Sequence, residues 1–177
     1  MTAAAEMPIL SDMNKLIIRP ANELDAQGIV KIYNPYITDT TITFEEDPVS
    51  VSEIKRRIEK VQTLGLPWIC GEVNGGLAGY AYATRWRERS AYRYTAESVI
   101  YLNKTSVGQG YGSRLYKALI EQLREAGIHA VIGVIALPNP VSVTLHEKLG
   151  FTKVAHFTEV GFKYGRWLDV GYWQLML

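Results

Sequence analysis

The 177-residue sequence predicts one α/β domain, with a mixed central sheet and helices on its faces. Its segments follow one another as a strand, two helices, three strands, a helix, a strand, a helix and two strands. Asn74-Gly75-Gly76 stands between two apolar segments and is a strong hairpin signal, so part of the sheet is antiparallel. Residues 130–137 (AVIGVIAL) are continuously apolar, which is typical of a central strand buried on both faces. No repeat, linker or low-complexity tract divides the chain, and we expect one domain over residues 15–177.

The chain begins its first layer with a strand and a helix. Residues 15–21 (KLIIRPA) form a short apolar strand that Pro20 ends. Asn22 is a good N-cap for a helix of about 14 residues. The pair Asn34-Pro35 predicts the end of this helix, because a proline disfavours helical backbone in the residue before it.

A long loop and a second helix come next. Residues 37–48 alternate irregularly and are polar, which predicts a loop with some extended character. Ser50 and Glu53 have the spacing of a capping box, so we expect a helix that continues to about Leu64.

The middle of the chain predicts the sheet and its main helix. Residues 67–73 and 77–86 are the two strands of the hairpin, and residues 94–103 form a third strand. An amphipathic helix over about 110–126 follows, and Gly127 is well placed to end it.

The last elements are a short helix and two strands. Asn139 caps the helix and Gly150 ends it. Residues 151–160 and 167–177 are the final strands. The segment GRWLDVGYWQLML has an aromatic density that fits either core packing or an interface.

Composition excludes several classes of protein. The net charge of +1 and a sequence pI of about 7.8 give no support to nucleic-acid binding. Cys70 is the single cysteine, so no internal disulfide is possible, and a buried structural role is expected for it. No run of about 18 apolar residues is present to span a membrane. Residues 1–14 resemble a frayed lead-in rather than a signal peptide, and we expect a cytoplasmic protein with no membrane partner.

The glycine-rich segment VGQGYGSRLY, residues 107–116, leads into the amphipathic helix. Glycines there let the unpaired N–H groups of a helix N-terminus approach a phosphate closely, although a tight strand-to-helix turn is the alternative. A Walker A loop is excluded, because Gly112-Ser113-Arg114 lacks its lysine. A dinucleotide fingerprint is excluded by the glycine spacing.

The order strand, Gly-x-Gly, helix, strand, Asn-x-x-Ser, helix, Gly-Phe resembles the GNAT superfamily of N-acetyltransferases over about residues 15–160. The resemblance implies a mostly antiparallel sheet of about six or seven strands, about four flanking helices and two splayed central strands. It implies acetyl-CoA as cosubstrate and no metal. Val107 departs from the superfamily pattern, which has Arg or Gln at this position of the pyrophosphate loop.

Four further segments resemble the phosphinothricin N-acetyltransferase group, which includes enzymes acting on methionine sulfoximine and methionine sulfone. They are YRYTAESVIYL, GYGSRLY, VIALPNPVSVTLHEKLGF and GFKYGRWLDVGYWQ, in that order. The resemblance implies transfer of an acetyl group to the α-amine of a small amino acid analogue, as in antibiotic or herbicide resistance. It also implies a homodimer formed through the C-terminal region.

Two residues are candidates for proton transfer. Glu97 is a charge in a strand of apolar and hydroxyl residues, which is costly unless it has a role or faces solvent. The resemblance implies that it is the catalytic glutamate, acting through water. His146 stands where the phosphinothricin group has a histidine, as base or acid. His129 and His156 match no motif, and three scattered histidines predict no metal site.

The resemblance also implies the acetyl-CoA contacts. The backbone N–H of Leu102 is expected to bind the acetyl carbonyl, with Tyr101 and Asn103 beside it. Asn139 and Ser142 are expected to meet the pantetheine arm, and Asn139 serves equally as a helix N-cap. The expected pyrophosphate loop consists of Val107, Gly108, Gln109, Gly110, Tyr111, Gly112 and Ser113.

For the acceptor, the arginine- and aromatic-rich segment RWRERSAYRY precedes the catalytic strand. Arginine binds carboxylate or phosphinate with two hydrogen bonds, although charged hairpin loops are usually solvated. The group resemblance links Trp86, Arg87 and Tyr92 to acceptor binding, and Phe44 is expected to form the opposite wall. These residues indicate a small amphoteric acceptor with a free α-amine.

Two other functions stay open at this point. A degenerate acyl-CoA sensor would explain Val107, whereas the presence of Glu97 and His146 argues against it. An acetyltransferase of peptide or protein amines would need an open acidic groove, and the arginine-rich segment argues for a small anion instead.

Overall fold

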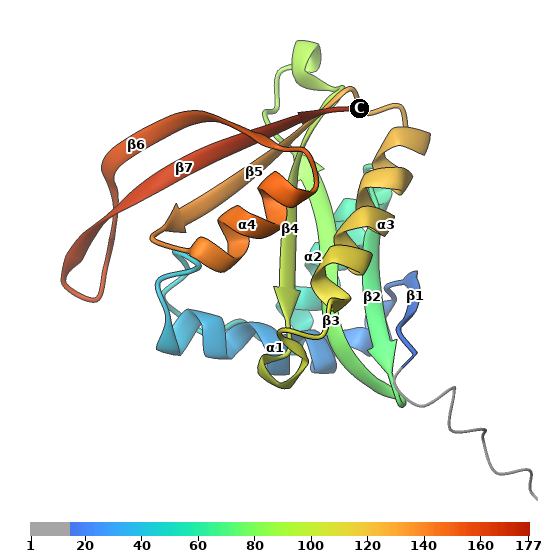
Figure 1. Ribbon diagram of the computed structural model, residues 1–177. Coiled ribbons are helices and arrows are strands. Elements are labelled where there is room, and N and C mark those ends of the chain that lie inside the picture. The colour runs from blue at the N-terminus through green and yellow to red at the C-terminus, as the bar shows by residue number, and fades with distance from the viewer. Residues whose placement is uncertain (1–14) are drawn as a thin grey trace, which may run out of the picture.

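A computed structural model describes residues 15–177, so the expected lead-in at residues 1–14 lies outside the described residues. A seven-stranded mixed sheet has the order β1-β2-β3-β4-β5-β7-β6 (Figure 1). Helix α3 covers one face of β2 to β4, and α1 and α2 cover the other. The predicted fold class is confirmed. The strands are β1 (Ile17–Pro20), β2 (Trp68–Val73), β3 (Gly76–Arg85), β4 (Thr95–Leu102), β5 (Ala130–Leu137), β6 (Thr152–Lys163) and β7 (Arg166–Met176), and the helices are α1 (Ala26–Asp39), α2 (Val51–Thr63), α3 (Tyr111–Glu125) and α4 (Pro140–Lys148).

The β2–β3 hairpin is confirmed together with its turn. Asn74 and Gly75 have φ values of 51° and 77°, the left-handed backbone that a two-residue hairpin turn requires. The β6–β7 hairpin turns in the same way at Tyr164 and Gly165, with φ values of 52° and 72°. Tyrosine is unusual at such a position, so this turn carried no comparable sequence signal.

The two central strands diverge as the resemblance implied. Strands β4 and β5 pair in parallel only over Thr95–Ser98 and Ala130–Gly133. Beyond this point β4 stays paired with β3, and β5 stays paired with β7. The sheet therefore opens between β4 and β5 after the Ser98–Gly133 pair.

Helix α1 has the predicted length of about 14 residues but begins and ends later in the chain than predicted. It begins after a short 3₁₀ turn that Asn22 caps, and it continues through Pro35 to Asp39. The prediction that it ends at Asn34-Pro35 is wrong, because tertiary contacts hold the turn beyond the proline: Ile37 is fully buried, and the Tyr36 hydroxyl donates to the Leu102 carbonyl at 2.7 Å. The unfavourable interior proline is therefore tolerated.

Residues 40–50, between α1 and α2, contain no strand, and side chains fix their backbone instead. Asn34 hydrogen-bonds both the N–H and the carbonyl of Val49, at 3.0 and 3.1 Å. Lys163, which is 1% exposed, donates to the carbonyls of Ile37 and Thr43 at 2.7 and 2.8 Å. The tip of the β6–β7 hairpin is thereby tied to this loop.

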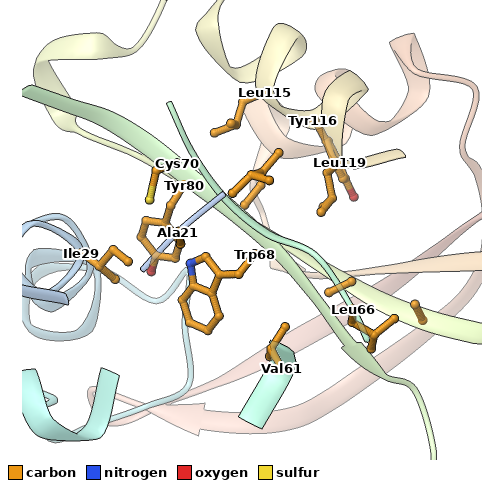
Figure 2. Close-up of a cluster of buried hydrophobic side chains, with 14 of the residues drawn as sticks. Ala21, Ile29, Val61, Leu66, Trp68, Cys70, Tyr80, Leu115, Tyr116 and Leu119 are labelled. Atoms are coloured by element: carbon orange, nitrogen blue, oxygen red, sulfur yellow. The ribbon is translucent and has the colours of Figure 1, made fainter. Parts of the chain in front are cut away.

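The main core lies on both faces of β2 and β3. Figure 2 shows Trp68 and Tyr80 on one side of these strands and Leu115 and Leu119 of α3 on the other. Cys70 is fully buried among them, and burial raises the pKa of its thiol to about 12. The thiol therefore stays protonated and unreactive at neutral pH, as expected for a structural cysteine.

Replacement of Lys163 by methionine should destabilise the protein. Methionine keeps most of the side-chain volume but leaves the buried Thr43 carbonyl without its donor. We expect the free energy of unfolding to fall by about 1–3 kcal/mol, the penalty for one unpaired buried polar group. Urea denaturation measures it, and Lys117→Met, at an exposed position of α3, is the matched control. Equal midpoints for both variants would contradict the structural role of Lys163.

Candidate active site

The opening between β4 and β5 contains a cavity of about 290 Å³. Its walls come from β4, β5, β7, α4 with its N-cap residue, and the loop after α1. Six of the residues predicted from the sequence line it together: Phe44, Glu97, Tyr101, Asn139, Ser142 and His146.

Glu97 lies half-buried in β4, directly across from Thr84 of β3. Burial raises the pKa of its carboxyl above the ordinary value of 4.5, and the positive charge of Arg87 opposes this increase. Within residues 15–177 no side chain or backbone group is hydrogen-bonded to the Glu97 carboxylate. A raised pKa and free oxygens facing a cavity are what a general base requires.

His146 is buried in α4 and is 4% exposed. Its Nδ1 lies 2.8 Å from the Ser142 carbonyl oxygen, and its Nε2 lies 2.9 Å from the Tyr116 hydroxyl. Burial lowers the pKa of the imidazole, while the Ser142 carbonyl raises it to a smaller extent. Both ring nitrogens are therefore engaged inside the protein.

The end of β4 presents backbone donors to the opening. Asn103 N–H donates to the Ala78 carbonyl of β3 at 2.8 Å. Because donors alternate along a strand, the N–H of Leu102 points away from β3, toward the side where β5 has separated. The Tyr101 ring packs among the rings of Tyr33, Tyr36 and Tyr80, and the Asn103 side chain caps the turn that follows. Of these three predicted residues, Leu102 offers the donor.

The glycine loop joins β4 to α3. Gly108 and Gly110 have φ values of 83° and 78°, and nothing lies within 4 Å of where a Cβ would stand. Gly110 is the N-cap of α3 and makes no side-chain cap bond, and Val107 of the same loop is exposed. Gln109 is held by a hydrogen bond from its amide to the Thr105 carbonyl at 2.9 Å. This backbone fits the shape of a phosphate cradle.

The residues at the start of α3 have different surroundings. The Tyr111 side chain is buried against Leu16 and Ala78, so only its backbone faces the loop. A Cβ on Gly112 would lie 3.2 Å from Leu102, which shows how closely α3 approaches β4. Ser113 is half-buried at the third helical position.

Asn139 serves as the N-cap of α4, as the alternative expectation stated. Its Oδ1 accepts from Ser142 N–H at 3.1 Å, and Pro140 follows at the first helical position. Capping uses the amide oxygen only, so the Asn139 amide nitrogen and the Ser142 hydroxyl remain beside the cavity.

The acceptor candidates occupy two places. Phe44 lines the cavity, and its ring occupies the space that a side chain on Gly161 of β6 would need. Trp86 and Tyr92 form an edge-on pair with centroids 5.2 Å apart, and the Arg87 guanidinium lies 5.0 Å from the Trp86 ring. Trp86, Arg87 and Tyr92 do not line the cavity. Arg87 affects the cavity only electrostatically, because its positive charge lowers the pKa of Glu97.

Sequence reasoning missed several residues of the site. Thr43 lines the cavity beside Phe44, Tyr36 bonds to the Leu102 carbonyl, and Ser98 joins Tyr116 and His146 on the opposite face of β4 from Glu97. Tyr116 belongs to the apolar stripe of α3 and gave no signal beyond core packing. Residues 15–177 contain no cluster of metal-ligating side chains and no helix long and apolar enough to cross a membrane.

The sequence and structure of the chain are similar to those of known acetyltransferases. Residues 18–171 match the family model of the acetyltransferase (GNAT) domain. The chain is 40% identical over 157 residues to a phosphinothricin N-acetyltransferase of Streptomyces viridochromogenes, covering 89% of this chain and 85% of the relative. It is 36% identical to an L-methionine sulfoximine/L-methionine sulfone acetyltransferase of Salmonella typhimurium, covering 92% and 95%. A GNAT superfamily phosphinothricin acetyltransferase from Sinorhizobium meliloti, solved in complex with acetyl-CoA, superposes with a TM-score of 0.89 at 34% identity, covering 92% of this chain and 88% of that one.

Proposed function

The chain belongs to the GNAT acetyltransferase family, and on this premise we propose that it transfers the acetyl group of acetyl-CoA to the α-amine of a small amino acid analogue. Phosphinothricin, methionine sulfoximine and methionine sulfone are the acceptors that the relatives' names indicate. The observation that carries the proposal is the half-buried Glu97 carboxylate, without a hydrogen-bond partner in the described chain, facing the cavity where β4 and β5 separate.

In this mechanism Glu97 removes a proton from the acceptor ammonium, directly or through one water. The neutral amine can then attack the acetyl carbonyl carbon, because the cavity keeps the two reactants together. The amide C–N bond forms as the thioester C–S bond breaks, CoA leaves as the thiolate, and the proton lost from the attacking nitrogen balances the one that the thiolate takes up. The N–H of Leu102 is the donor for the acetyl carbonyl oxygen, since it faces the opening and belongs to a rigid strand.

Acetyl-CoA supplies the activated acetyl group. The residues present fit it: the open glycine backbone at Gly108 and Gly110 suits the pyrophosphate, and the polar groups of Asn139 and Ser142 suit the pantetheine amides. Val107, at the position of the family's Arg or Gln, removes one side-chain contact, while the backbone donors stay.

Arg87 is the proposed partner for the acidic end of the acceptor, with Trp86 and Tyr92 shaping its surroundings and Phe44 opposite.

A homodimer is part of the proposal. Exposed apolar side chains on the β6–β7 hairpin, among them Phe162 and Trp167, support it, and sedimentation equilibrium tests it. We also propose a cytoplasmic location and a role in resistance to such amino acid analogues.

A thiol-release assay tests the function. Purified protein is mixed with acetyl-CoA and each of phosphinothricin, methionine sulfoximine, methionine sulfone, the common amino acids and short peptides, and free CoA is followed. Fast release with the three analogues is expected. Release with peptides alone would identify a peptide acetyltransferase instead, and tight CoA binding without any release would identify a sensor.

The rate should depend on pH through Glu97. A general base works only when deprotonated, so kcat/KM should fall as the pH drops through a pKa above 4.5. Arg87→Gln removes the positive charge that lowers this pKa, and it should shift the midpoint of the acidic limb to higher pH. Arg124→Gln, on the surface of α3, is the control. A midpoint that Arg87→Gln leaves in place would contradict the assignment.

A further inference from the structure

A buried chain of hydrogen bonds runs through the wall of the cavity, to which Ser98, Ser142 and His146 contribute. Ser98 Oγ lies 2.6 Å from the Tyr116 hydroxyl, which lies 2.9 Å from His146 Nε2. His146 Nδ1 lies 2.8 Å from the Ser142 carbonyl. Tyr116 is fully buried, and Ser98 and His146 are 6% and 4% exposed. These three side chains are therefore almost entirely shielded from bulk water.

The direction of the bonds follows from the carbonyl. A carbonyl oxygen only accepts, so His146 Nδ1 carries a proton and donates it to Ser142. In the neutral ring Nε2 is then an acceptor, and the Tyr116 hydroxyl donates to it. The Ser98 hydroxyl has one proton for two acceptors, the Tyr116 oxygen at 2.6 Å and the Ile132 carbonyl at 3.3 Å. Burial, which lowers the imidazole pKa, favours this neutral form.

The chain links the two arms of the splayed sheet. Ser98 belongs to β4, and Tyr116 belongs to α3, which packs on the β2–β4 arm. His146 belongs to α4, which follows β5. Its ring lies on Gly133, where a Cβ would stand 2.5 Å from ring atoms Cδ2 and Nε2. Gly133 and Ser98 are the last paired residues before the strands diverge, so the chain spans the apex of the opening.

The ring lines the cavity, but these contacts occupy both of its nitrogens. Nδ1 and Nε2 both bond to protein, and Phe151 packs edge-on against the ring with centroids 5.0 Å apart. No carboxylate or cationic side chain of the described chain is hydrogen-bonded to the ring. The neighbouring Glu147 instead accepts from Trp173 Nε1 at 3.2 Å.

We propose that His146 and Tyr116 are positioning residues: the Ser98–Tyr116–His146 chain braces the β4 and β5 arms at the apex and fixes the width of the opening, and His146 exchanges no proton with the reactants. The inference rests on the proposed acetyl transfer and departs from the role that family resemblance implies for His146. Glu97, on the other face of β4, is then the base.

The first test reads the ring itself and needs no turnover. The protein has three histidines, so long-range ¹H–¹⁵N spectra resolve His146 once His146→Gln identifies its signals. We expect a neutral ring with the proton on Nδ1 between about pH 6 and 8, around and above the ordinary histidine pKa. A ring that titrates across this range like an exposed imidazole would overturn the proposal.

The second test compares the kcat of variants with that of the wild type. It uses an acceptor on which the wild type is active in the thiol-release assay. Gln at position 146 places an amide oxygen where it can accept from Tyr116 but carries no titratable proton, whereas Leu of similar size accepts nothing. We expect His146→Gln to keep at least about ten times the kcat of His146→Leu, the factor that one hydrogen bond of about 1.4 kcal/mol supplies. Tyr116→Phe should lower kcat about tenfold. The Kd for CoA should stay within about twofold of wild type, since the CoA contacts proposed above, at the glycine loop, Asn139 and Ser142, do not include the Tyr116 hydroxyl.

Equal loss of kcat in His146→Gln and His146→Leu would make His146 a proton carrier and overturn the proposal, as would a Tyr116→Phe variant with wild-type kcat. A wild-type protein inactive on every acceptor would instead refute the proposed function, and the ring spectra would still decide whether the chain holds His146 neutral.

Discussion

Replacement of Glu97 by glutamine should reduce turnover about 100- to 10,000-fold, the range that a positioned general base contributes. Glutamine keeps the size and polarity of the side chain but accepts no proton from the acceptor ammonium. Glu97 faces the α1 and α2 side of β4, whereas the glycine loop leads into α3 on the opposite side. The Kd for CoA should therefore stay within about twofold of wild type.

Steady-state kinetics and CoA titration measure the two quantities separately. Glu125→Gln, at an exposed position near the end of α3, removes the same charge away from the cavity and serves as the matched control. If Glu97→Gln turned over at the rate of Glu125→Gln, Glu97 would have no part in proton removal.

Replacement of Gly133 by alanine should affect both stability and turnover. The added Cβ would stand 2.5 Å from two atoms of the His146 ring, which its two hydrogen bonds prevent from moving freely. We expect the free energy of unfolding to fall by about 1–3 kcal/mol, as in other overpacked cores. We expect kcat to fall at least about tenfold, because displacing the ring breaks the bond to Tyr116.

Gly76→Ala is the matched control for this variant. Gly76 also lies in a strand, and the nearest atom to an added Cβ there is the Val73 carbonyl oxygen at 3.7 Å, an ordinary contact. Urea denaturation and initial rates compare the two proteins. A Gly133→Ala variant with the stability and kcat of Gly76→Ala would show that the His146 ring is not held in place at the apex.

Elements with a local chemical signal were predictable from the sequence. The turn at Asn74-Gly75 needs left-handed backbone, and the residues there favour it. Ser50 and Asn139 accept hydrogen bonds from the helices that they cap. The strand at residues 130–137 is largely buried, as its continuous apolar run indicated.

Features that depend on tertiary contact were not predictable. Pro35 indicated a helix end, and only the contacts of Tyr36 and Ile37 with the rest of the protein explain the additional turn. The end of the strand predicted at residues 151–160 was placed too early, because β6 continues to Lys163 through two register irregularities. Lys163 itself is paired with carbonyls distant in sequence.

The candidate site divides in the same way. The position of Glu97 beside the cavity could be predicted because a charge in an apolar strand is unusual. The engagement of both His146 nitrogens could not, since it depends on Tyr116, whose spacing on α3 resembles that of any core residue. Sequence motifs identified which residues gather at the opening, whereas the division of roles between Glu97 and His146 needed the three-dimensional hydrogen bonds.

The measurement that tests the central claim most directly is identification of the product. Acetyl-CoA labelled with ¹³C in the acetyl group is incubated with the protein and phosphinothricin, and the mixture is analysed by mass spectrometry and NMR. The account predicts phosphinothricin carrying one labelled acetyl group on its α-nitrogen, with one free CoA formed per product. Labelled acetate as the only product, or label found on the protein and not on the amino acid, would contradict it.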